Sequence, residues 1–518
     1  MILTAASGET LWARFERVAA ARADHPALIQ GDTRTSFAEL AAAALRYGRA
    51  FRDAGVRPGD RCLFFSTNRP ELAAAMLGAW RAGAVVALLN DEAPLAHLEH
   101  AIRVVAPAAL VTADSDAGRV AGLFDGPLVA LGGGGLPPAD NRPAAIVDPA
   151  EPASIFFTSG STGMPKGVTQ SHRTLVEACI SVGGHLGLGE ADRILCPIPW
   201  SFDYGYGQLL STLLLGVTQL LPTERNALAI CAALEAQRPT VFAGLPSIFA
   251  LLLRGVSTLR TTDTGSVRLV TNTGGPIPDA IFAELQTAFP ASAFSLNYGM
   301  TETYRSAGLP PALAASHPHS VGLAYPGVDL RILREDGSEA GPDEVGELVH
   351  RGTGVFMGYW GDPEATARVL RPDPFAPADG QTPKVVFTGD LAVRDREGLL
   401  TIRGRRDRLI KSMGVRVSPD EIEALLHGSG LVAGAVVAGL PHDIYGQMVV
   451  AAVVARPGID GLDRQLKAFA RTVMSRHMQP RHYLVVEQFP LTPNGKPDHA
   501  AIRRLLDEAT ANPRARSA

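Results

Sequence analysis

Short apolar runs alternate with helix-like segments along the first half of the chain, and this alternation constrains the fold more than any other feature. Leu11–Ala21 has amphipathic spacing and Phe37–Ala54 is rich in alanine, so both are predicted as helices. Arg61–Ser66 and Ala84–Leu89 are predicted as strands on either side of a helix at Pro70–Ala82. Strands that alternate with helices predict an α/β fold, in which parallel sheets are covered by helices on both faces.

Composition and charge exclude several classes of protein. The 518 residues are enough for roughly three to five structural units. The net charge of −4 gives no electrostatic reason to expect a nucleic acid or an anionic membrane as a partner. The four cysteines lack metal-ligand spacing, so we expect buried thiols in a reducing compartment. Met1–Glu9 shows no signal peptide and Leu209–Leu221 is too short and polar to span a bilayer, which predicts a cytoplasmic protein without membrane insertion.

A loop rich in glycine and hydroxyl groups follows the apolar run Ala153–Phe157, which is predicted as a buried strand. The loop consists of Thr158, Ser159, Gly160, Ser161, Thr162 and Gly163. Such a loop can bring backbone N–H groups and short hydroxyls close to an anion, because glycine has no Cβ to block the approach. Lys166 adds a positive charge at its far end, which predicts a phosphate-binding loop, although no Gly-Lys-Ser/Thr sequence makes it a Walker A motif.

This loop, with its Pro-Lys-Gly ending, resembles the signature loop of the AMP-forming adenylating enzymes, a superfamily that includes acyl-CoA synthetases, peptide-synthetase adenylation domains and luciferases. A second motif of that family is matched by residues 297–302. The resemblance implies that Tyr298 lies against adenine, Thr301 bonds the α-phosphate and Glu302 binds Mg²⁺. One carboxylate is chemically sufficient, since Mg²⁺ bound to phosphates takes only one or two carboxylates from the protein.

The second half of the chain carries further family motifs. Asp390 resembles the carboxylate that binds the ribose hydroxyls, and Arg405 resembles a nucleotide ligand. The resemblance implies that Asp407 is the hinge between domains and that Gly414 leaves room for a pantetheine arm. Lys496 resembles the mobile catalytic lysine. The neighbouring Arg403, Arg406 and Arg408 are interpreted as a solvated face.

The same resemblance predicts the domain organisation. Residues 1–403 form a large N-terminal domain of α/β layers, and its part from about 320 to 403 is a β-rich subdomain of short strands separated by turns. Residues 404–407 form the hinge, 408–505 a small mobile α+β C-terminal domain and 506–518 a tail.

The implied reaction has two half-reactions and requires ATP and Mg²⁺. A carboxylate attacks the α-phosphorus of ATP and forms an acyl-adenylate with release of pyrophosphate. A thiol then displaces AMP. The family implies that Lys166, Thr301, Glu302 and Lys496 act in catalysis, mainly by positioning and by stabilising charge.

The substrate is less constrained than the reaction. Asp203, in the sequence Ser-Phe-Asp, resembles the aspartate with which amino-acid-activating relatives bind the substrate ammonium group. The alternative is that Asp203 caps the following segment and that the pocket is apolar. Phe202, Tyr304 and Arg305 are further candidates for the pocket, with Arg305 expected either to bind a second carboxylate or, more simply, to form a surface ion pair.

The remaining hypotheses concern two glycines near the acyl group and the thiol that accepts it. Gly274 and Gly275 would let the backbone approach the acyl group. The favoured hypothesis is an α- or β-amino acid loaded onto an acyl or peptidyl carrier protein. The alternative is an acyl-CoA synthetase that joins a fatty or aryl acid to CoA. A non-catalytic binding protein on the same fold and a luciferase-like oxygenase are the hypotheses of other classes.

Overall fold

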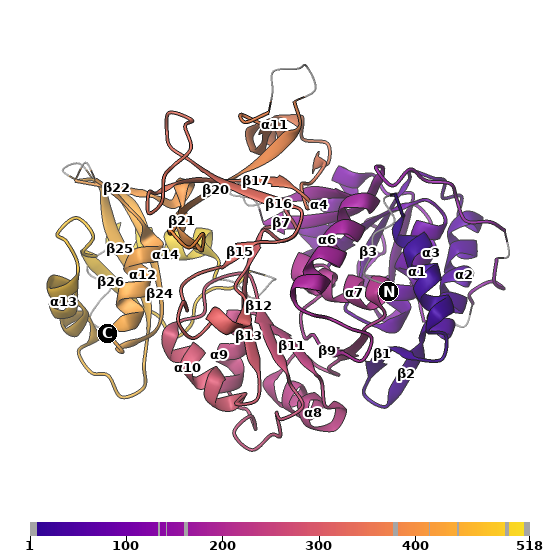
Figure 1. The fold of residues 1–518 in the computed structure, drawn as a ribbon, viewed down its shortest axis with the longest axis horizontal. Coiled ribbons are helices and arrows are strands. Elements are labelled where there is room, and N and C mark those ends of the chain that lie inside the picture. Colours follow the sequence, from indigo (N-terminus) through magenta and orange to yellow (C-terminus); the bar gives the residue numbers. More distant parts are fainter. Residues whose placement is uncertain are drawn as a thin grey trace. The chain divides into compact units, whose positions relative to one another are not determined.

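The computed structural model describes residues 8–132, 135–140, 142–159, 164–376, 382–413, 415–442, 445–492 and 497–511 (Figure 1). The chain forms two compact units, one made of residues 1–331 and 349–387 and the other of residues 332–348 and 388–518. Each unit is described by itself below. The domain boundaries that the sequence predicts remain predictions.

The first sheet of the first unit is mainly parallel. Its strand order is β15 (Leu323–Ala324), β14 (Ala307–Gly308), β13 (Ala293–Tyr298), β12 (Leu269–Asn272), β11 (Val241–Gly244), β9 (Arg193–Leu195), β10 (Thr218–Leu221), β1 (Pro26–Gln30) and β2 (Thr33–Ser36). The strands from β13 to β1 in this order pair in parallel, while β14, β15 and β2 are antiparallel additions at the edges. The loops after β12 and β13 therefore lie at the same edge, where open α/β sheets bind ligands.

The second sheet of the first unit has a parallel centre and an antiparallel hairpin. Its strand order is β18 (Gly358–Tyr359), β8 (Pro165–Ser171), β7 (Pro152–Ser159), β4 (Val85–Leu89), β3 (Arg61–Phe65), β5 (Ala109–Ala113) and β6 (Leu128–Leu131). Strands β7 and β8 pair antiparallel, and β18 pairs antiparallel with β8. The sequence analysis did not predict β8. Because β8 pairs with β7, the glycine-rich loop connects the two strands of a hairpin.

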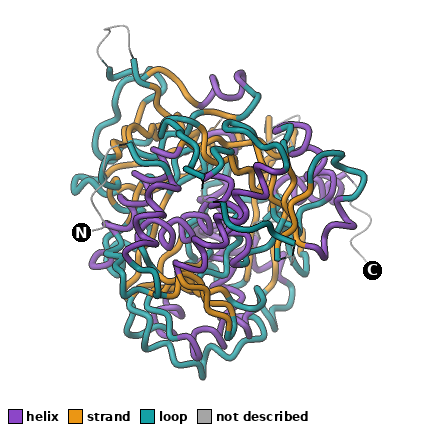
Figure 2. The backbone as a smooth tube through the Cα atoms, turned by 90° about the vertical axis from the view of Figure 1, so that its right-hand side faces the viewer, coloured by secondary structure: helices purple, strands orange, loops and turns teal. Residues whose placement is uncertain are grey.

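Helices pack on both sheets, as the alternation predicts. The helices of the first unit are α1 (Leu11–Ala21), α2 (Phe37–Asp53), α3 (Pro70–Arg81), α4 (Leu95–Val105), α5 (Ala117–Val120), α6 (His172–His185), α7 (Asp203–Leu215), α8 (Ala227–Gln237), α9 (Pro246–Arg254), α10 (Asp279–Ala288) and α11 (Pro363–Val369). Helix α1 contacts α2, α3, α6 and α7, and every residue of α7 is buried. One hydrophobic core joins side chains of both sheets to these helices, and Figure 2 shows helices and strands interleaved along the backbone.

The division between the units falls within strands of a third sheet. Its order is β16 (Val328–Leu333), β17 (Gly346–Gly352), β20 (Lys384–Arg394) and β19 (Leu370–Pro372), and β21 (Leu400–Arg405) also pairs with β20. Most of these strands are short, but β20 has 11 residues.

The second unit has an α+β core at its C-terminal end. Its sheet has the order β23 (Val415–Val417), β22 (Ile410–Ser412), β25 (Gly446–Ala455) and β24 (Val432–His442), with β26 (His482–Val485) beside β25. The helices are α12 (Pro419–Gly428), α13 (Leu462–Val473) and α14 (His499–Ala511). The prediction of a tail from residue 506 is wrong for its first part, because α14 continues to Ala511 and Leu506 is buried.

Two predictions about composition can be checked against this structure. Cys62, Cys179, Cys196 and Cys231 are free thiols, and each is buried, as expected. Within the ranges described above, no helix combines the length and the apolar character needed to cross a membrane.

Candidate active site

The phosphate-binding loop lies at the tip of the β7–β8 hairpin. Thr158 is opposite Lys166 in the register, and Ser159 is opposite Pro165. Gly160, Ser161, Thr162 and Gly163 lie outside the described residues. The hairpin fixes the backbone on both sides of the loop, because β7 continues into the parallel sheet and β8 is paired on its other side by β18.

Tyr359 stands between Lys166 and Glu302. Its phenol oxygen donates a hydrogen bond to Glu302 Oε1 at 2.6 Å. The Lys166 ammonium nitrogen lies 5.1 Å from the centre of the Tyr359 ring, within the range of a cation–π interaction. The pairing of Tyr359 with Val168 in β8 explains this position, since it places Tyr359 beside the residues that follow the loop. Two residues that the sequence assigned to catalysis are thus brought to one aromatic ring.

Two hydrogen bonds to backbone carbonyl groups hold the turn after β13. The Gln170 side chain donates to the carbonyl oxygen of Thr301 at 2.9 Å, and the Phe356 N–H donates to that of Glu302 at 3.0 Å. Tyr298 ends β13 and is half-buried, while Glu302 is buried. The turn is therefore attached to β8 and to the segment before β18, which fixes the position of Thr301 and Glu302.

Glu302 provides the chemistry that a magnesium ion requires. A carboxylate oxygen is a hard ligand, and Mg²⁺ in nucleotide sites takes one or two of them together with phosphate oxygens. The hydrogen bond from Tyr359 orients this carboxylate, and the contact from the Phe356 N–H holds the backbone of Glu302. Such orientation of a ligand by its neighbours supports metal binding, so the residues present fit a magnesium ion held jointly with phosphate.

Asp203 and Arg305 form a buried ion pair. Asp203 is the first residue of α7, and its Oδ1 accepts a hydrogen bond from the Tyr204 N–H at 2.8 Å. Its Oδ2 lies 3.9 Å from an Arg305 guanidinium nitrogen, and the two side chains are 10% and 4% exposed. The expectation of a surface ion pair for Arg305 is wrong. Its neighbours bury it, and the charge it meets is that of Asp203.

Two tyrosine rings enclose the Arg305 guanidinium group. Its central carbon lies 4.7 Å from the centre of the Tyr204 ring and 5.4 Å from that of Tyr304. Tyr304 has a φ of 58°, a left-handed conformation that costs energy for a bulky residue and persists only where the surroundings fix it. Burial raises the pKa of the Tyr304 phenol well above its usual value, so this ring is neutral at physiological pH.

Replacing Arg305 with Met should destabilise the first unit by about 3 kcal/mol, because Asp203 would remain as a buried charge without its partner. The double variant Asp203→Asn/Arg305→Met should recover most of that stability, since no charge is then left buried alone. Urea unfolding of the two variants and the parent protein measures this. Equal stability of the single and double variants would contradict an energetic link between the two side chains.

The other residues predicted to line the substrate pocket, Phe202, Gly274 and Gly275, lie before α7 and after β12. Phe202 is half-buried before α7 and packs on the hydrophobic core. Gly274 and Gly275 follow β12 with φ of 86° and 159°, values that favour glycine. The Asn272 side chain donates to the Gly275 carbonyl oxygen at 3.3 Å, which closes this turn beside the end of the strand.

Asp390, Arg405 and Asp407 come together in the second unit. Asp390 pairs with Arg405 in the β20–β21 register, and an Arg405 guanidinium nitrogen lies 3.2 Å from Asp390 Oδ1. Arg405 Nε also donates to Asp407 Oδ1 at 3.2 Å. A Cβ on Gly404, whose φ is 122°, would lie 2.5 Å from Asp420 Oδ2, so a side chain there would displace that carboxylate. Three residues that the sequence placed at the ribose, the nucleotide and the hinge are thus neighbours.

The arginines around this cluster are not equivalent. Arg403 and Arg406 are exposed, as expected. The interpretation of Arg408 as part of a solvated face is wrong, because it forms ion pairs with Asp420 at 2.5 Å and Glu423 at 2.9 Å on α12. Gly414 and Lys496 lie outside the described residues, so their predicted roles stay predictions.

Sequence reasoning missed Tyr359, Gln170 and His350. Tyr359 and Gln170 contact the nucleotide motif from distant parts of the chain, and the contact between Tyr359 and Glu302 joins residues 57 positions apart. His350 contacts Ser306, four residues after the motif. No periodicity or spacing in a single sequence marks such contacts.

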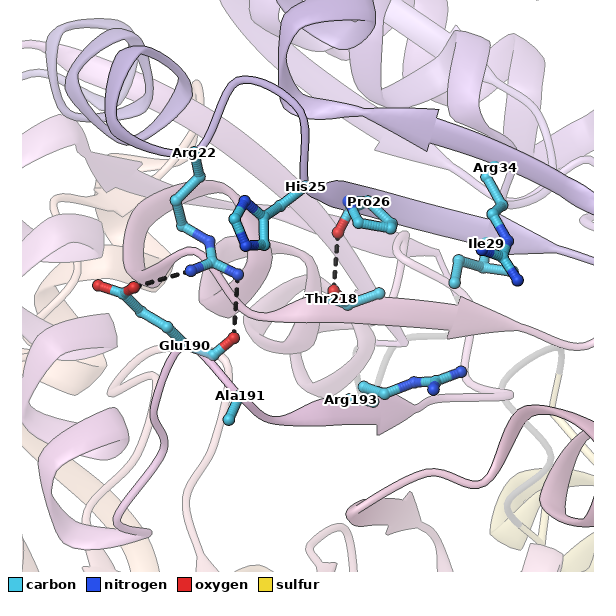
Figure 3. Close-up of a pocket in the computed structure, with 9 residues that line it drawn as sticks. All are labelled: Arg22, His25, Pro26, Ile29, Arg34, Glu190, Ala191, Arg193 and Thr218. Atoms are coloured by element: carbon cyan, nitrogen blue, oxygen red, sulfur yellow. Dashed lines mark hydrogen bonds and ion pairs between the residues drawn. The ribbon is translucent and has the colours of Figure 1, made fainter.

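A pocket at the opposite edge of the first sheet has a structural role. Its lining residues are Arg22, His25, Pro26, Ile29, Arg34, Glu190, Ala191, Arg193 and Thr218 (Figure 3). Arg22 pairs with Glu190 at 2.7 Å, and the Thr218 hydroxyl donates to the Pro26 carbonyl oxygen at 2.7 Å (Figure 3). Since β1, β9 and β10 begin here, these contacts attach the start of β1 to the sheet, away from the motif loops.

Comparison with known families identifies the class of this protein. Residues 15–360 match the family model described as AMP-binding enzyme, and residues 421–496 match the AMP-binding enzyme C-terminal domain. The chain therefore belongs to the AMP-binding enzyme family, and the resemblance to the AMP-forming adenylating enzymes is confirmed.

Individual relatives agree with this assignment. The chain is 31% identical to a feruloyl-CoA synthase of Amycolatopsis over 92% of the chain and 95% of the relative. It is 30% identical to a 2-succinylbenzoate–CoA ligase of Geobacillus kaustophilus over 93% and 95%. The solved anthranilate CoA ligase AuaEII has the same fold, with a TM-score of 0.88 at 23% identity over 98% and 99% of the two chains. The predicted fold class and the prediction of an adenylating ligase are confirmed.

Proposed function

We propose that this enzyme activates a carboxylic acid without an amine, preferably an aryl acid, with ATP and transfers it to CoA. The feruloyl-CoA synthase and the 2-succinylbenzoate–CoA ligase act on such acids, according to their names, and this supports the CoA alternative rather than the favoured hypothesis of an amino acid loaded onto a carrier protein. The proposal has two parts that are tested separately: the class of acid that is activated and the thiol that accepts it.

The observation that carries the substrate class is the ion pair between Asp203 and Arg305. An aspartate that binds a substrate ammonium group must keep its charge available in an apolar pocket. Here the charge already faces a buried guanidinium group, which is enclosed by two tyrosine rings. A substrate ammonium group would have to compete with Arg305, whereas an uncharged aryl or acyl group would not.

The remaining roles follow the family pattern as proposals. The hairpin loop and Lys166 bind the phosphates of ATP, Thr301 bonds the α-phosphate and Tyr298 packs against adenine. Asp390 and Arg405 bind the ribose and the nucleotide. Glu302 holds Mg²⁺, which when bound supplies positive charge to the phosphate oxygens. Lys496 stabilises the adenylation transition state, and a rotation at Asp407 separates the two half-reactions.

The test measures pyrophosphate release with matched pairs of acids that differ by one amino group. 3-Phenylpropanoate is compared with phenylalanine and with 3-amino-3-phenylpropanoate, and cinnamate and benzoate are included as plain aryl acids. We expect the plain acids to be preferred over the α- and β-amino acids by at least about tenfold, because a charged ammonium group would be desolvated without a free partner.

The thiol is tested with the best acid from that panel. CoA and a phosphopantetheine-loaded carrier protein are offered separately, and thioester formation is followed by mass spectrometry. Preference for phenylalanine or its β-isomer, lost in Asp203→Ala, would overturn the proposed substrate class. Transfer to the carrier protein but not to CoA would overturn the proposed acceptor.

A further inference from the structure

His350 is a buried histidine beside the nucleotide motif with no role in the reaction outlined above. It lies on β17 and is 0% exposed. Burial lowers the pKa of His350 to about 4, so the ring is neutral at physiological pH. Its Nε2 lies 2.9 Å from the Thr353 carbonyl oxygen, and its Nδ1 lies 3.0 Å from Ser306 Oγ. A carbonyl only accepts hydrogen bonds, so the single proton of the neutral ring is on Nε2.

The remaining hydrogen bonds then have a fixed direction. Since Nδ1 carries no proton, the Ser306 hydroxyl must donate to it. Ser306 Oγ therefore accepts from the Thr303 hydroxyl, which is 3.0 Å away. Thr303 Oγ1 in turn accepts from the Met300 N–H at 3.2 Å. The Met300 carbonyl oxygen, 3.2 Å from Thr303 Oγ1, competes for the same hydroxyl proton. It already accepts from the Thr303 N–H at 2.9 Å, and Ser306 Oγ is the nearer acceptor at 3.0 Å, so we assign the hydroxyl proton to the bond with Ser306.

This directed chain ends in the turn that carries Thr301 and Glu302. The turn is tight, because a Cβ on Gly299 would lie 2.9 Å from Arg305 Cα. The segment after His350 packs closely on the same turn, since a Cβ on Gly354 would lie 2.2 Å from the Thr303 carbonyl oxygen. The two ends of this hydrogen-bond chain, the turn at Met300 and the segment after His350, are therefore closely packed. The His350 ring, whose proton position is fixed, links them.

We propose that His350 is a positioning residue for ATP. Through Ser306 and Thr303 it fixes the backbone of Met300 and thereby the two residues that follow. The proposal rests on the proposed function only in assuming that Thr301 and Glu302 contact the nucleotide and its magnesium ion. It assigns to a neutral imidazole on β17 a role that a hydrophobic residue of similar size could not fill.

The test measures binding of α,β-methylene-ATP with magnesium chloride by calorimetry, which requires no turnover and no acid substrate. His350→Leu removes both hydrogen bonds and should weaken binding about tenfold, the effect of losing one hydrogen-bonded network position. His350→Asn keeps an acceptor near the position of Nδ1, so its binding should remain within about threefold of the parent protein.

Thr303→Val breaks the same chain at its other end and should also weaken binding about tenfold. Both changes interrupt the same hydrogen-bond chain. The double variant His350→Leu/Thr303→Val should therefore bind the nucleotide about as weakly as either single variant. A loss of about a hundredfold in the double variant would mean that the two residues act independently, and would overturn the proposal.

His172 supplies the matched control. It is also buried, its pKa is also lowered to about 4, and it accepts a hydrogen bond from the Leu11 N–H at 3.3 Å on α1. His172→Leu should lower the melting temperature and leave nucleotide binding unchanged. An equal loss of binding in His172→Leu would overturn the proposal. If His350→Leu does not fold, Ser306→Ala interrupts the chain with a smaller change and carries the same expected tenfold loss.

The proposed function can fail separately. Pyrophosphate release with none of the acids would contradict the proposed reaction, while the binding measurement would still decide the role of His350.

Discussion

Glu302→Gln is expected to lower ATP–pyrophosphate exchange by about a hundredfold to a thousandfold, the range found when one charge-stabilising group is removed from an active site. Glutamine has nearly the same shape and still offers an oxygen to the Tyr359 hydroxyl, which donates to Glu302 at 2.6 Å in the parent protein. The change therefore removes the charge and leaves the contact. The magnesium concentration that gives half-maximal exchange should rise strongly, and a titration with magnesium chloride at fixed ATP measures it.

Two further variants separate charge from position. Tyr359→Phe keeps the ring beside Lys166 but removes the hydrogen bond to Glu302, and should cost about tenfold in exchange. Glu284→Gln is the control, because Glu284 forms an exposed ion pair with Arg254 and surface pairs contribute little. An unchanged magnesium dependence in Glu302→Gln would contradict its assignment as the metal ligand.

Lys496→Ala should reduce adenylation by at least about a hundredfold and leave thioester formation from a preformed acyl-adenylate nearly intact. The physical reason is that its positive charge is needed when a carboxylate approaches the α-phosphate, where two anions meet. Once the adenylate exists, that repulsion has been overcome and the thiol attacks a neutral carbonyl carbon. Pyrophosphate exchange measures the first half-reaction, and CoA consumption with synthetic adenylate measures the second.

The control for this prediction is Lys467→Ala on α13. Lys467 pairs with Asp463 at 2.8 Å across one helical turn and is 40% exposed, so its removal should change neither half-reaction. Equal damage to both half-reactions in Lys496→Ala would contradict its assignment to the adenylation step.

Local patterns made much of the architecture predictable. Leu11–Ala21 has the same bounds in the structure as in the sequence prediction, and the strand predicted at Arg61–Ser66 ends one residue earlier, at Phe65. Helix and strand periodicities are encoded in adjacent residues, so such elements can be predicted locally. The strand β8 was missed, since Pro165-Lys166-Gly167 disfavours a strand locally. Pairing with β7 and β18 on its two sides overrides that local preference.

The family and the reaction class were predictable for the same reason, but the contacts that hold the candidate site together were not. The motifs around Lys166, Thr301, Glu302, Asp390 and Arg405 are short and contiguous, so the sequence by itself determined the family and the reaction class. The ion pair of Arg305 with Asp203, the position of Tyr359 and the hydrogen-bond chain from His350 depend on which strands become neighbours. Only the tertiary structure decides them, because they join residues tens to over a hundred positions apart and a buried charge or imidazole takes its properties from whatever surrounds it.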